Sequence, residues 1–263
     1  MDALKDGTDE GIHEKVGVGM IFMSVITFIS AVFVAAPYGR FLATTSSWGP
    51  QVNARVAWLL MESPNVWWSL AGIFWIGRTE CLHSLPNLIL LACFTAHYIN
   101  RSFIYPLMLR GPKPMPLSIP CLAFLFCFVN GYLQSRWLTS VHVYPDQWLL
   151  DWRFIAGVAI FLFGLYSNIR CDRILVNLRK PGETGYKIPR GFLFEYVTSA
   201  NYFAEIVEWS GLALAASSLA GVAFALYTFS NLAPRANTTH KWYLDKFKEE
   251  YPVTRKAIIP FLW

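Results

Sequence analysis

The chain has 263 residues, of which 55% are hydrophobic and only 15% are charged, and its formal net charge is +5. A water-soluble domain of this length would not stay in solution easily with so few charged side chains, so we expect an integral membrane protein and no nucleic-acid partner. The five cysteines form no C-x-x-C pair and no metal-ligand spacing, which argues against disulfides and against a metal site.

Seven apolar segments are each long enough, at about 20 residues, to be transmembrane helices. In chain order they are 16–36, 55–76, 85–107, 116–136, 152–171, 196–214 and 217–233. The last two are divided at the sequence AASS (215–218), because the apolar run from Phe192 to Ala233 is too long for one crossing. The expected fold is therefore all-α, with residues 1–263 forming a single membrane domain.

The loop charges predict how these helices are oriented. If the N-terminus lies outside or in a lumen, most of the 22 Lys and Arg residues fall on the inner side, together with a cytosolic C-terminus. The first apolar run is long enough to remain as a membrane span rather than to act as a signal peptide. The membrane would be that of the endoplasmic reticulum in a eukaryote or the plasma membrane in a bacterium.

A basic loop, LRKPGETGYKIPRG at residues 178–191, lies between two apolar segments on the inner side. Its cations could serve only to orient the chain beside anionic lipid. However, Asn168 with Asp172, and Asn201 with Glu205, form two i, i+4 pairs of hydrogen-bonding residues on the same side. Cations, carboxylates and amides together match the phosphates, ribose hydroxyls and amide of a nicotinamide dinucleotide. No Rossmann glycine fingerprint offers such a cofactor another site, so we expect it within the helical bundle.

Glu62, in LLMESP, is the one acidic residue of the second apolar segment, where burial favours the neutral acid. Pro64 can disturb the helix beside it. A structural hydrogen bond to a neighbouring helix would explain Glu62, and so would contact with a substrate. In the third segment, Tyr98, Arg101 and Tyr105 share one helical face, and Tyr105 is best explained by packing. Glu62 and Tyr98 could together donate hydrogen bonds to a carbonyl oxygen in a dry pocket.

Several motifs, in one order, resemble the steroid 5-alpha-reductase family. LRKPGETGYKIPRGFLFEYVTSANYFAEIVEW (178–209) is similar to that family's L-R-K-P-G, Y-x-I-P-x-G-x-L-F-x-Y-V, A-N and E-W motifs. Further motifs match ARVAWLLMESP (54–64), HYINRSFIYP (97–106) and YPVTRKAIIPFLW (251–263). The resemblance covers nearly the whole chain but is much weaker over residues 1–50.

The resemblance implies a seven-helix reductase that uses NADPH on a 3-oxo-Δ4 steroid. By motif position, Glu62 and Tyr98 would hold the C3 carbonyl while hydride is added to C5. Spans one to four, roughly 16–136, would form the substrate side, and residues 152–263 the NADPH side. The residues expected to bind the cofactor, from the resemblance and from the basic loops, are Arg101, Lys113, Asn168, Asp172, Arg179, Tyr186, Lys187, Asn201, Glu205, His240 and Tyr243.

Three places depart from the family's motifs. N-I-H-S-D reads NIRCD at 168–172, H-H-x-x-Y reads THKWY at 239–243, and Met61 replaces a Gln beside Glu62. The first two bear on cofactor contacts and the third on how Glu62 is oriented. Three other interpretations stay open: a sterol double-bond reductase, an isoprenylcysteine methyltransferase-like enzyme, or a proton-coupled carrier. The hydropathy shows no inverted repeat of the kind that many carriers have. The sequence names neither the physiological substrate nor the oligomeric state.

Overall fold

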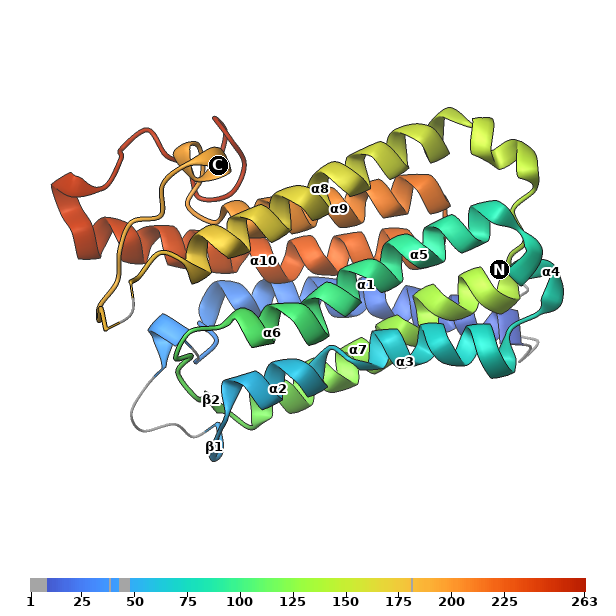
Figure 1. The fold of residues 1–263 in the computed structure, drawn as a ribbon, viewed down its shortest axis with the longest axis horizontal. Helices are drawn as coiled ribbons and strands as arrows, with labels where there is room; N and C mark the ends of the chain where they lie inside the picture. The colour runs from blue at the N-terminus through green and yellow to red at the C-terminus, as the bar shows by residue number, and fades with distance from the viewer. Residues whose placement is uncertain (1–8, 38, 43–47, 181) are drawn as a thin grey trace.

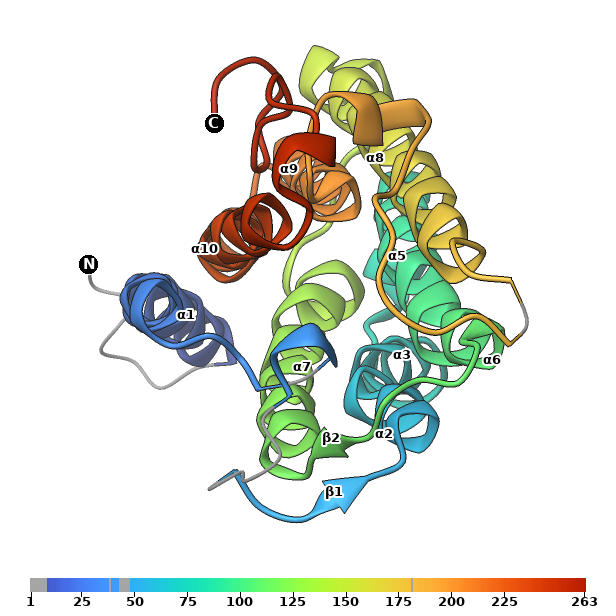
Figure 2. The ribbon, with the colours of Figure 1, turned by 90° about the vertical axis from the view of Figure 1, so that its left-hand side faces the viewer.

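The computed structural model describes residues 9–37, 39–42, 48–180 and 182–263, which are mostly helical. The longer helices run side by side along the long axis of the molecule (Figures 1 and 2). The helices are α1 (Asp9–Phe33), α2 (Ala54–Met61), α3 (Pro64–Ala71), α4 (Thr79–His83), α5 (Leu85–Ile99), α6 (Tyr105–Met108), α7 (Ser118–Arg136), α8 (Trp152–Val176), α9 (Ala200–Ala216) and α10 (Leu219–Phe247).

Shorter elements extend or connect these helices. Turns of π-helix follow α3, α5 and α7 at Gly72–Ile76, Asn100–Ile104 and Trp137–Val141. Turns of 3-10 helix lie at Gly39–Phe41, Asp146–Leu150, Phe192–Glu195 and Lys248–Glu250, and strand β1 (Gln51–Val52) pairs antiparallel with β2 (Met115–Pro116). We call the end of the molecule that carries β1, β2, the 177–191 loop and residues 248–263 the loop end; α4 lies at the opposite end (Figure 1).

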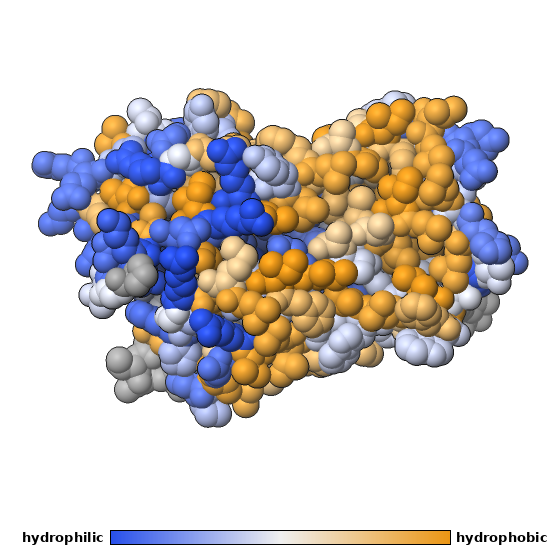
Figure 3. Space-filling model, in the orientation of Figure 1, coloured by the Kyte–Doolittle hydropathy of each residue, from blue (hydrophilic) through white to orange (hydrophobic). Residues whose placement is uncertain are grey.

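Each of the seven apolar segments predicted from the sequence contains helix in the structure. Within the described residues, three helical stretches are long and apolar enough to cross a membrane, namely Glu10–Phe33, Ser118–Val141 and Trp152–Val176. On the face that Figure 3 shows, hydrophobic residues cover the middle of the molecule, and hydrophilic residues gather at the loop end and, in smaller groups, at the opposite end. These features are those of a membrane protein.

The helix breaks lie where the sequence predicted them. Pro64 begins α3 directly after α2 has ended at Met61, because a proline fits the first turn of a helix, where its missing N–H would have no partner within the helix. Ser217 adopts a left-handed conformation that ends α9, and Ser218 caps α10 by accepting a hydrogen bond from the Gly221 backbone N–H.

Helix α10 differs from the prediction because it continues 14 residues beyond Ala233, through Pro234, to Phe247. The prediction followed apolarity, which ends near Ala233, whereas a helix can continue into polar sequence, and Pro234 removes one backbone hydrogen bond without ending α10. The polar extension of α10 lies at the loop end (Figure 1).

Helices α8 and α9 approach each other closely at glycines. A Cβ atom added at Gly164 would lie 2.5 Å from the backbone of Glu208, and glycines at 157 and 211 meet the facing backbone in the same way. This contact brings Asn168 and Asp172 on α8 beside the start of α9. Trp209 lies at the centre of the largest buried apolar cluster, with Phe94 and Phe161.

Candidate active site

The break between α2 and α3 positions Glu62. Its backbone carbonyl accepts hydrogen bonds from both the backbone and the side-chain N–H groups of Asn65, at 3.3 and 3.2 Å. Its carboxylate Oε1 lies 3.5 Å from Nε of Arg101, and only 16% of the Glu62 side chain is exposed. The neighbouring Met61, which departs from the family motif, is buried.

Arg101 joins Glu62 to a row of polar side chains on α8 and α9. Its Nη1 donates to Oδ2 of Asp172 at 3.0 Å, and the other carboxylate oxygen of Asp172 accepts from Asn201 Nδ2 at 3.1 Å. The Asn168 amide in turn donates to the Asn201 backbone carbonyl at 3.0 Å. The sequence placed these residues in separate i, i+4 pairs, and the structure brings the pairs together into one continuous row.

Aromatic rings enclose the guanidinium of Arg101. Its Cζ lies 4.6 Å from the centroid of Trp58 and 5.0 Å from that of Tyr105. Tyr105, which the sequence assigned to packing, therefore also makes a cation–π contact. The π-helical turn at Asn100–Ile104 lies between Tyr98 and Tyr105, so the regular i, i+3, i+7 face expected from the sequence is interrupted there.

Tyr98 is 4% exposed, and its ring stacks on Trp209 with centroids 5.7 Å apart. Its hydroxyl accepts a hydrogen bond from Asn130 Nδ2 at 3.3 Å. In the described part of the chain no hydrogen bond joins the Glu62 carboxyl group to the Tyr98 hydroxyl, so neither group uses the other as its partner. Both reach the bundle interior, from the α2–α3 break and from α5.

A second buried pair lies beside Tyr98. His97 Nδ1 and Glu208 Oε1 are 2.8 Å apart, and both side chains are almost completely buried. Glu205, one turn before Glu208 on α9, is half-buried. The contact ties α5 to α9 at the level where Tyr98 stacks on Trp209.

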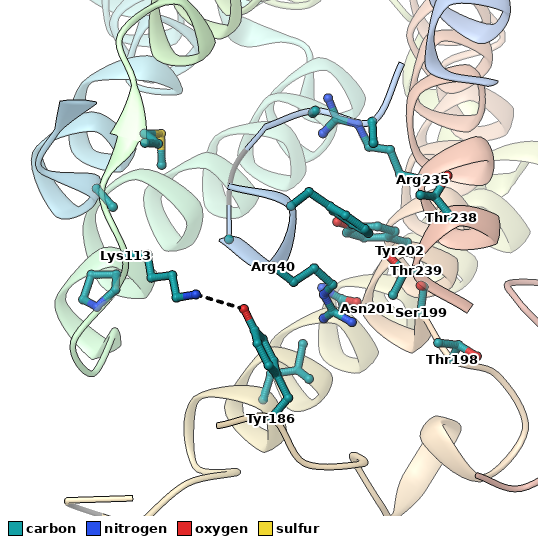
Figure 4. A pocket seen from close by; sticks show the side chains of 18 of the residues that line it. Arg40, Lys113, Tyr186, Thr198, Ser199, Asn201, Tyr202, Arg235, Thr238 and Thr239 are labelled. Atoms are coloured by element: carbon teal, nitrogen blue, oxygen red, sulfur yellow. Dashed lines mark hydrogen bonds between the residues drawn. The ribbon is translucent and has the colours of Figure 1, made fainter. Parts of the chain in front are cut away.

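A cavity of about 440 Å³ opens at the loop end, and its wall comes from segments far apart in the sequence. Figure 4 shows Arg40 from the segment after α1, Lys113, Tyr186, and residues of α9 and α10 around this space. Its polar and basic lining includes Arg40, Lys113, Arg179, Tyr186, Ser199, Asn201, Arg235, Thr239 and Tyr243. Asn201 belongs both to the cavity wall and to the row that begins at Glu62, so the cavity and the buried row are contiguous.

The 177–191 loop is held in place by its own contacts and by the C-terminal segment. Lys113 Nζ donates to the Tyr186 hydroxyl at 3.3 Å across the cavity, and Arg179 Nη1 donates to the Gly185 carbonyl at 3.4 Å. The Glu183 carboxylate accepts hydrogen bonds from the Lys187 ammonium and the Lys180 backbone N–H, and so connects the two sides of the turn. These hydrogen bonds lower the pKa of the Glu183 carboxyl. The loop is thereby preorganised with its cations at the loop end.

Arg255 and His240 lie behind the loop. Arg255 is 1% exposed, and its Nη1 donates to the Pro189 carbonyl at 3.1 Å. His240 Nδ1 is 2.5 Å from Thr198 Oγ1. Thr198 lines the cavity and His240 does not, so His240 lies next to the cavity wall rather than in it.

Among the residues expected to bind a cofactor, Lys113, Arg179, Tyr186, Asn201 and Tyr243 line the cavity. Arg101, Asn168, Asp172 and Glu205 lie deeper in the bundle or along the row, and Lys187 stands behind Tyr243, whose hydroxyl donates to the Lys187 carbonyl at 3.5 Å. The structure therefore brings nine of the eleven residues together in two adjoining groups and leaves Lys187 and His240 outside the cavity lining.

Two basic residues that line the cavity, Arg40 and Arg235, were not predicted from the sequence to belong to the site. Arg40 lies over the rings of Trp242 and Tyr243, 4.9 and 4.7 Å from their centroids. Arg235 lines the cavity from α10 (Figure 4). Arg235 was hidden because the predicted helix ended at Ala233, and Arg40 lies in the N-terminal part, where the resemblance to family motifs is weak.

The departures from family motifs leave the polar row intact. Arg170 donates to the Tyr166 hydroxyl at 3.1 Å and lies over Phe192, on the outer face of α8. Cys171 is completely buried in a small apolar cluster with Phe194. Neither side chain interferes with the contacts of Asn168 and Asp172.

A bundle with an apolar surface, a buried row of acids and amides, and an adjoining basic cavity defines a helical membrane enzyme. Residues 113–263 match the family model described as 3-oxo-5-alpha-steroid 4-dehydrogenase. The chain is 51% identical over 241 residues to 3-oxo-5-alpha-steroid 4-dehydrogenase 1 of Bos taurus, an overlap that covers 91% of this chain and 93% of the relative. It is 45% identical over 253 residues to steroid 5-alpha-reductase DET2 of Arabidopsis thaliana, covering 93% and 94% of the two chains. The chain belongs to the 3-oxo-5-alpha-steroid 4-dehydrogenase family, whose members are oxidoreductases.

Proposed function

We propose that this protein uses NADPH to reduce the Δ4 double bond of 3-oxo-Δ4 steroids, giving 5α-dihydro products. The observation that carries the proposal is the continuous polar row from Glu62 through Arg101 and Asp172, which links a buried acid to the basic cavity. When bound, NADPH supplies a hydride for C5 while C4 takes a proton, so that enone, NADPH and a proton become saturated ketone and NADP+. The names of the relatives support the same reaction.

Glu62 and Tyr98 act on the C3 carbonyl as hydrogen-bond donors. Adding hydride to an enone builds negative charge on this oxygen, so donors held in a dry site stabilise the transition state more than the ground state. In this proposal Glu62 is the neutral acid when it donates, which its burial favours, and Asp172, 3.0 Å from Arg101, is the counter-charge of the guanidinium.

The cavity residues fit a dinucleotide phosphate. Nη1 of Arg40 and Oδ1 of Asn168 are buried polar atoms without a hydrogen-bond partner within the described residues, as expected of a site whose ligand supplies the partners. Arg179 and Lys113, which line the cavity, would meet phosphates, with arginine suited to bidentate binding, and Lys187 would join them by giving up its contact with Glu183. The remaining residues that we assign to the cofactor are Arg101, Asp172, Tyr186, Asn201, Glu205 and Tyr243, with His240 next to the cavity wall, and we add Arg235, which lines the cavity.

We further propose seven membrane crossings, with the N-terminus outside and the loop end in the cytosol. The concentration of cations and hydrophilic surface at the loop end supports this orientation. NADPH would enter from the cytosol, and the steroid would reach residues 16–136 from the bilayer. Cysteine labelling tests the topology: replacements at Lys187 and Arg78, which lie toward opposite ends of the bundle, should react from opposite sides. Labelling of both from one side would contradict seven crossings.

Purified protein with a 3-oxo-Δ4 steroid tests the catalytic assignment. Tyr98→Phe should lower kcat by about 100- to 1000-fold, the usual cost of one oxyanion donor, and leave NADPH binding unchanged. Glu62→Gln keeps a donor in its amide and should retain more activity than Glu62→Ala. Tyr166→Phe, on an exposed tyrosine of α8, is the matched control and should turn over at the parental rate. Parental rates for both Tyr98→Phe and Glu62→Ala would show that the carbonyl is held elsewhere.

A further inference from the structure

A chain of buried amides ends on the hydroxyl of Tyr98. Asn130 Nδ2 is 3.3 Å from Tyr98 Oη and 3.2 Å from Asn65 Oδ1. Gln134 Nε2 is 3.3 Å from Asn130 Oδ1 and 2.8 Å from the Ala220 carbonyl. The three amide side chains are at most 4% exposed, so they do not exchange these partners for bulk water.

Backbone carbonyls at both ends of this chain fix its direction. The Ala220 carbonyl can only accept, so Gln134 presents its NH₂ group there and to Asn130 Oδ1. At the other end Asn65 Nδ2 donates to the Glu62 carbonyl, which leaves Asn65 Oδ1 as the atom that faces Asn130. Both constraints require the NH₂ group of Asn130 to point toward Tyr98.

The packing around Asn130 preserves this arrangement. At the next residue, Gly131, a Cβ atom would lie 3.1 Å from both the Pro64 carbonyl oxygen and Asn65 Cα, so α7 lies directly against the start of α3. Tyr98 cannot move its ring far, since Phe94 and Trp209 pack against it. The hydroxyl therefore stays within reach of one fixed donor.

We propose that Asn130 is a positioning residue for catalysis: by donating to Tyr98 Oη, it directs the phenol proton away from the protein and toward the substrate carbonyl. A phenol oxygen that accepts a hydrogen bond is also a better donor through its own proton, because hydrogen bonds in a chain polarise one another. The inference rests on the proposed role of Tyr98 as a donor to the C3 carbonyl. It adds a residue on α7 that touches neither substrate nor cofactor.

A double-mutant cycle between Asn130 and Tyr98 tests the proposal, with kcat and KM for a 3-oxo-Δ4 steroid measured at saturating NADPH. Asn130→Leu should lower kcat about 10-fold or more, up to the roughly 100- to 1000-fold loss of Tyr98→Phe, and leave NADPH affinity unchanged. In the Tyr98→Phe background the same replacement should change kcat by less than about twofold, because no phenol proton remains to be directed. Asn130→Ser is the second variant, should the leucine prevent folding.

Asn87 provides the matched control. It is a buried asparagine whose Nδ2 donates to the Leu138 and His142 carbonyls, at 2.7 and 2.6 Å, without contacting Tyr98. Asn87→Leu should lower thermal stability and change kcat by the same factor in both backgrounds. If Asn130→Leu or Asn130→Ser also slows both backgrounds equally, Asn130 is only structural and the inference is wrong. If Tyr98→Phe itself turns over at the parental rate, the proposed role of Tyr98 fails instead, so the two failures are distinguishable.

Discussion

Arg101→Met should destabilise the fold more than the loss of any exposed ion pair. The guanidinium is 11% exposed and its Nη1 lies 3.0 Å from Oδ2 of Asp172, whose side chain is 6% exposed. At this distance the attraction is about 5.5 kcal/mol for an effective dielectric constant of about 20. Removing one partner leaves a buried carboxylate without its counter-charge, which typically costs about 3–5 kcal/mol. A loss of this size is a large part of the about 5–15 kcal/mol by which domains are usually stable.

The assay is denaturant-induced unfolding of the purified protein in detergent micelles without added nucleotide, followed by tryptophan fluorescence. Arg153→Met is the matched control, because Arg153 also pairs with an aspartate, Asp151, but is 39% exposed. It should change stability little, since water already screens the pair. Combining Arg101→Met with Asp172→Asn should recover more than half of the loss, because no unpaired carboxylate then remains. The reasoning would be wrong if Arg101→Met lost no more stability than Arg153→Met. It would also be wrong if the stability losses of Arg101→Met and Asp172→Asn simply added in the double variant.

Two further predictions concern the cavity and the helix contact that supports it. Arg179→Ala should raise the KM for NADPH at least about 10-fold and leave the KM for steroid nearly unchanged, since one charge-assisted phosphate contact is worth about 1.5–3 kcal/mol. An unchanged KM for NADPH, or equal use of NADH and NADPH by the parent protein, would contradict the assignment of Arg179 to the phosphates. Gly164→Ala should lower thermal stability and turnover together, because its Cβ would lie 2.5 Å from the Glu208 backbone, and overpacking of this kind costs about 1–3 kcal/mol. A Cβ atom at Gly19, in α1, would meet no neighbouring atom within 4 Å, so Gly19→Ala should be neutral or slightly stabilising. Equal changes in thermal stability from the two replacements would contradict the close contact of α8 with α9.

The sequence predicted the features that depend on local chemistry. The apolar segments located the helices, Pro64 marked the break beside Glu62, and AASS marked the turn before α10. The i, i+4 pairs at Asn168 and at Asn201 were visible because a helix fixes which neighbours share a face. These predictions needed no knowledge of how the helices pack.

The features that depend on packing could not be read in the same way. Asn65, Asn130 and Gln134 lie on α3 and α7, and their connection to Tyr98 on α5 exists only because Gly131 allows a close approach. The π-helical turn before Tyr105 has no pattern in hydrophobicity that would reveal it. Arg40 becomes a cavity residue through its contacts with Trp242 and Tyr243, about 200 residues away in the sequence.

The central claim is that this bundle carries out hydride transfer to C5 of an enone held by Glu62 and Tyr98. The most direct measurement uses NADPH carrying two deuterium atoms at C4 of the nicotinamide, with detergent-solubilised protein and a 3-oxo-Δ4 steroid, followed by mass spectrometry and NMR of the product. We expect one deuterium at C5 of the steroid with the 5α ring junction, and a rate about 100- to 1000-fold lower for Tyr98→Phe. Deuterium at C4, a 5β product, or NADPH consumption without a reduced steroid would contradict it.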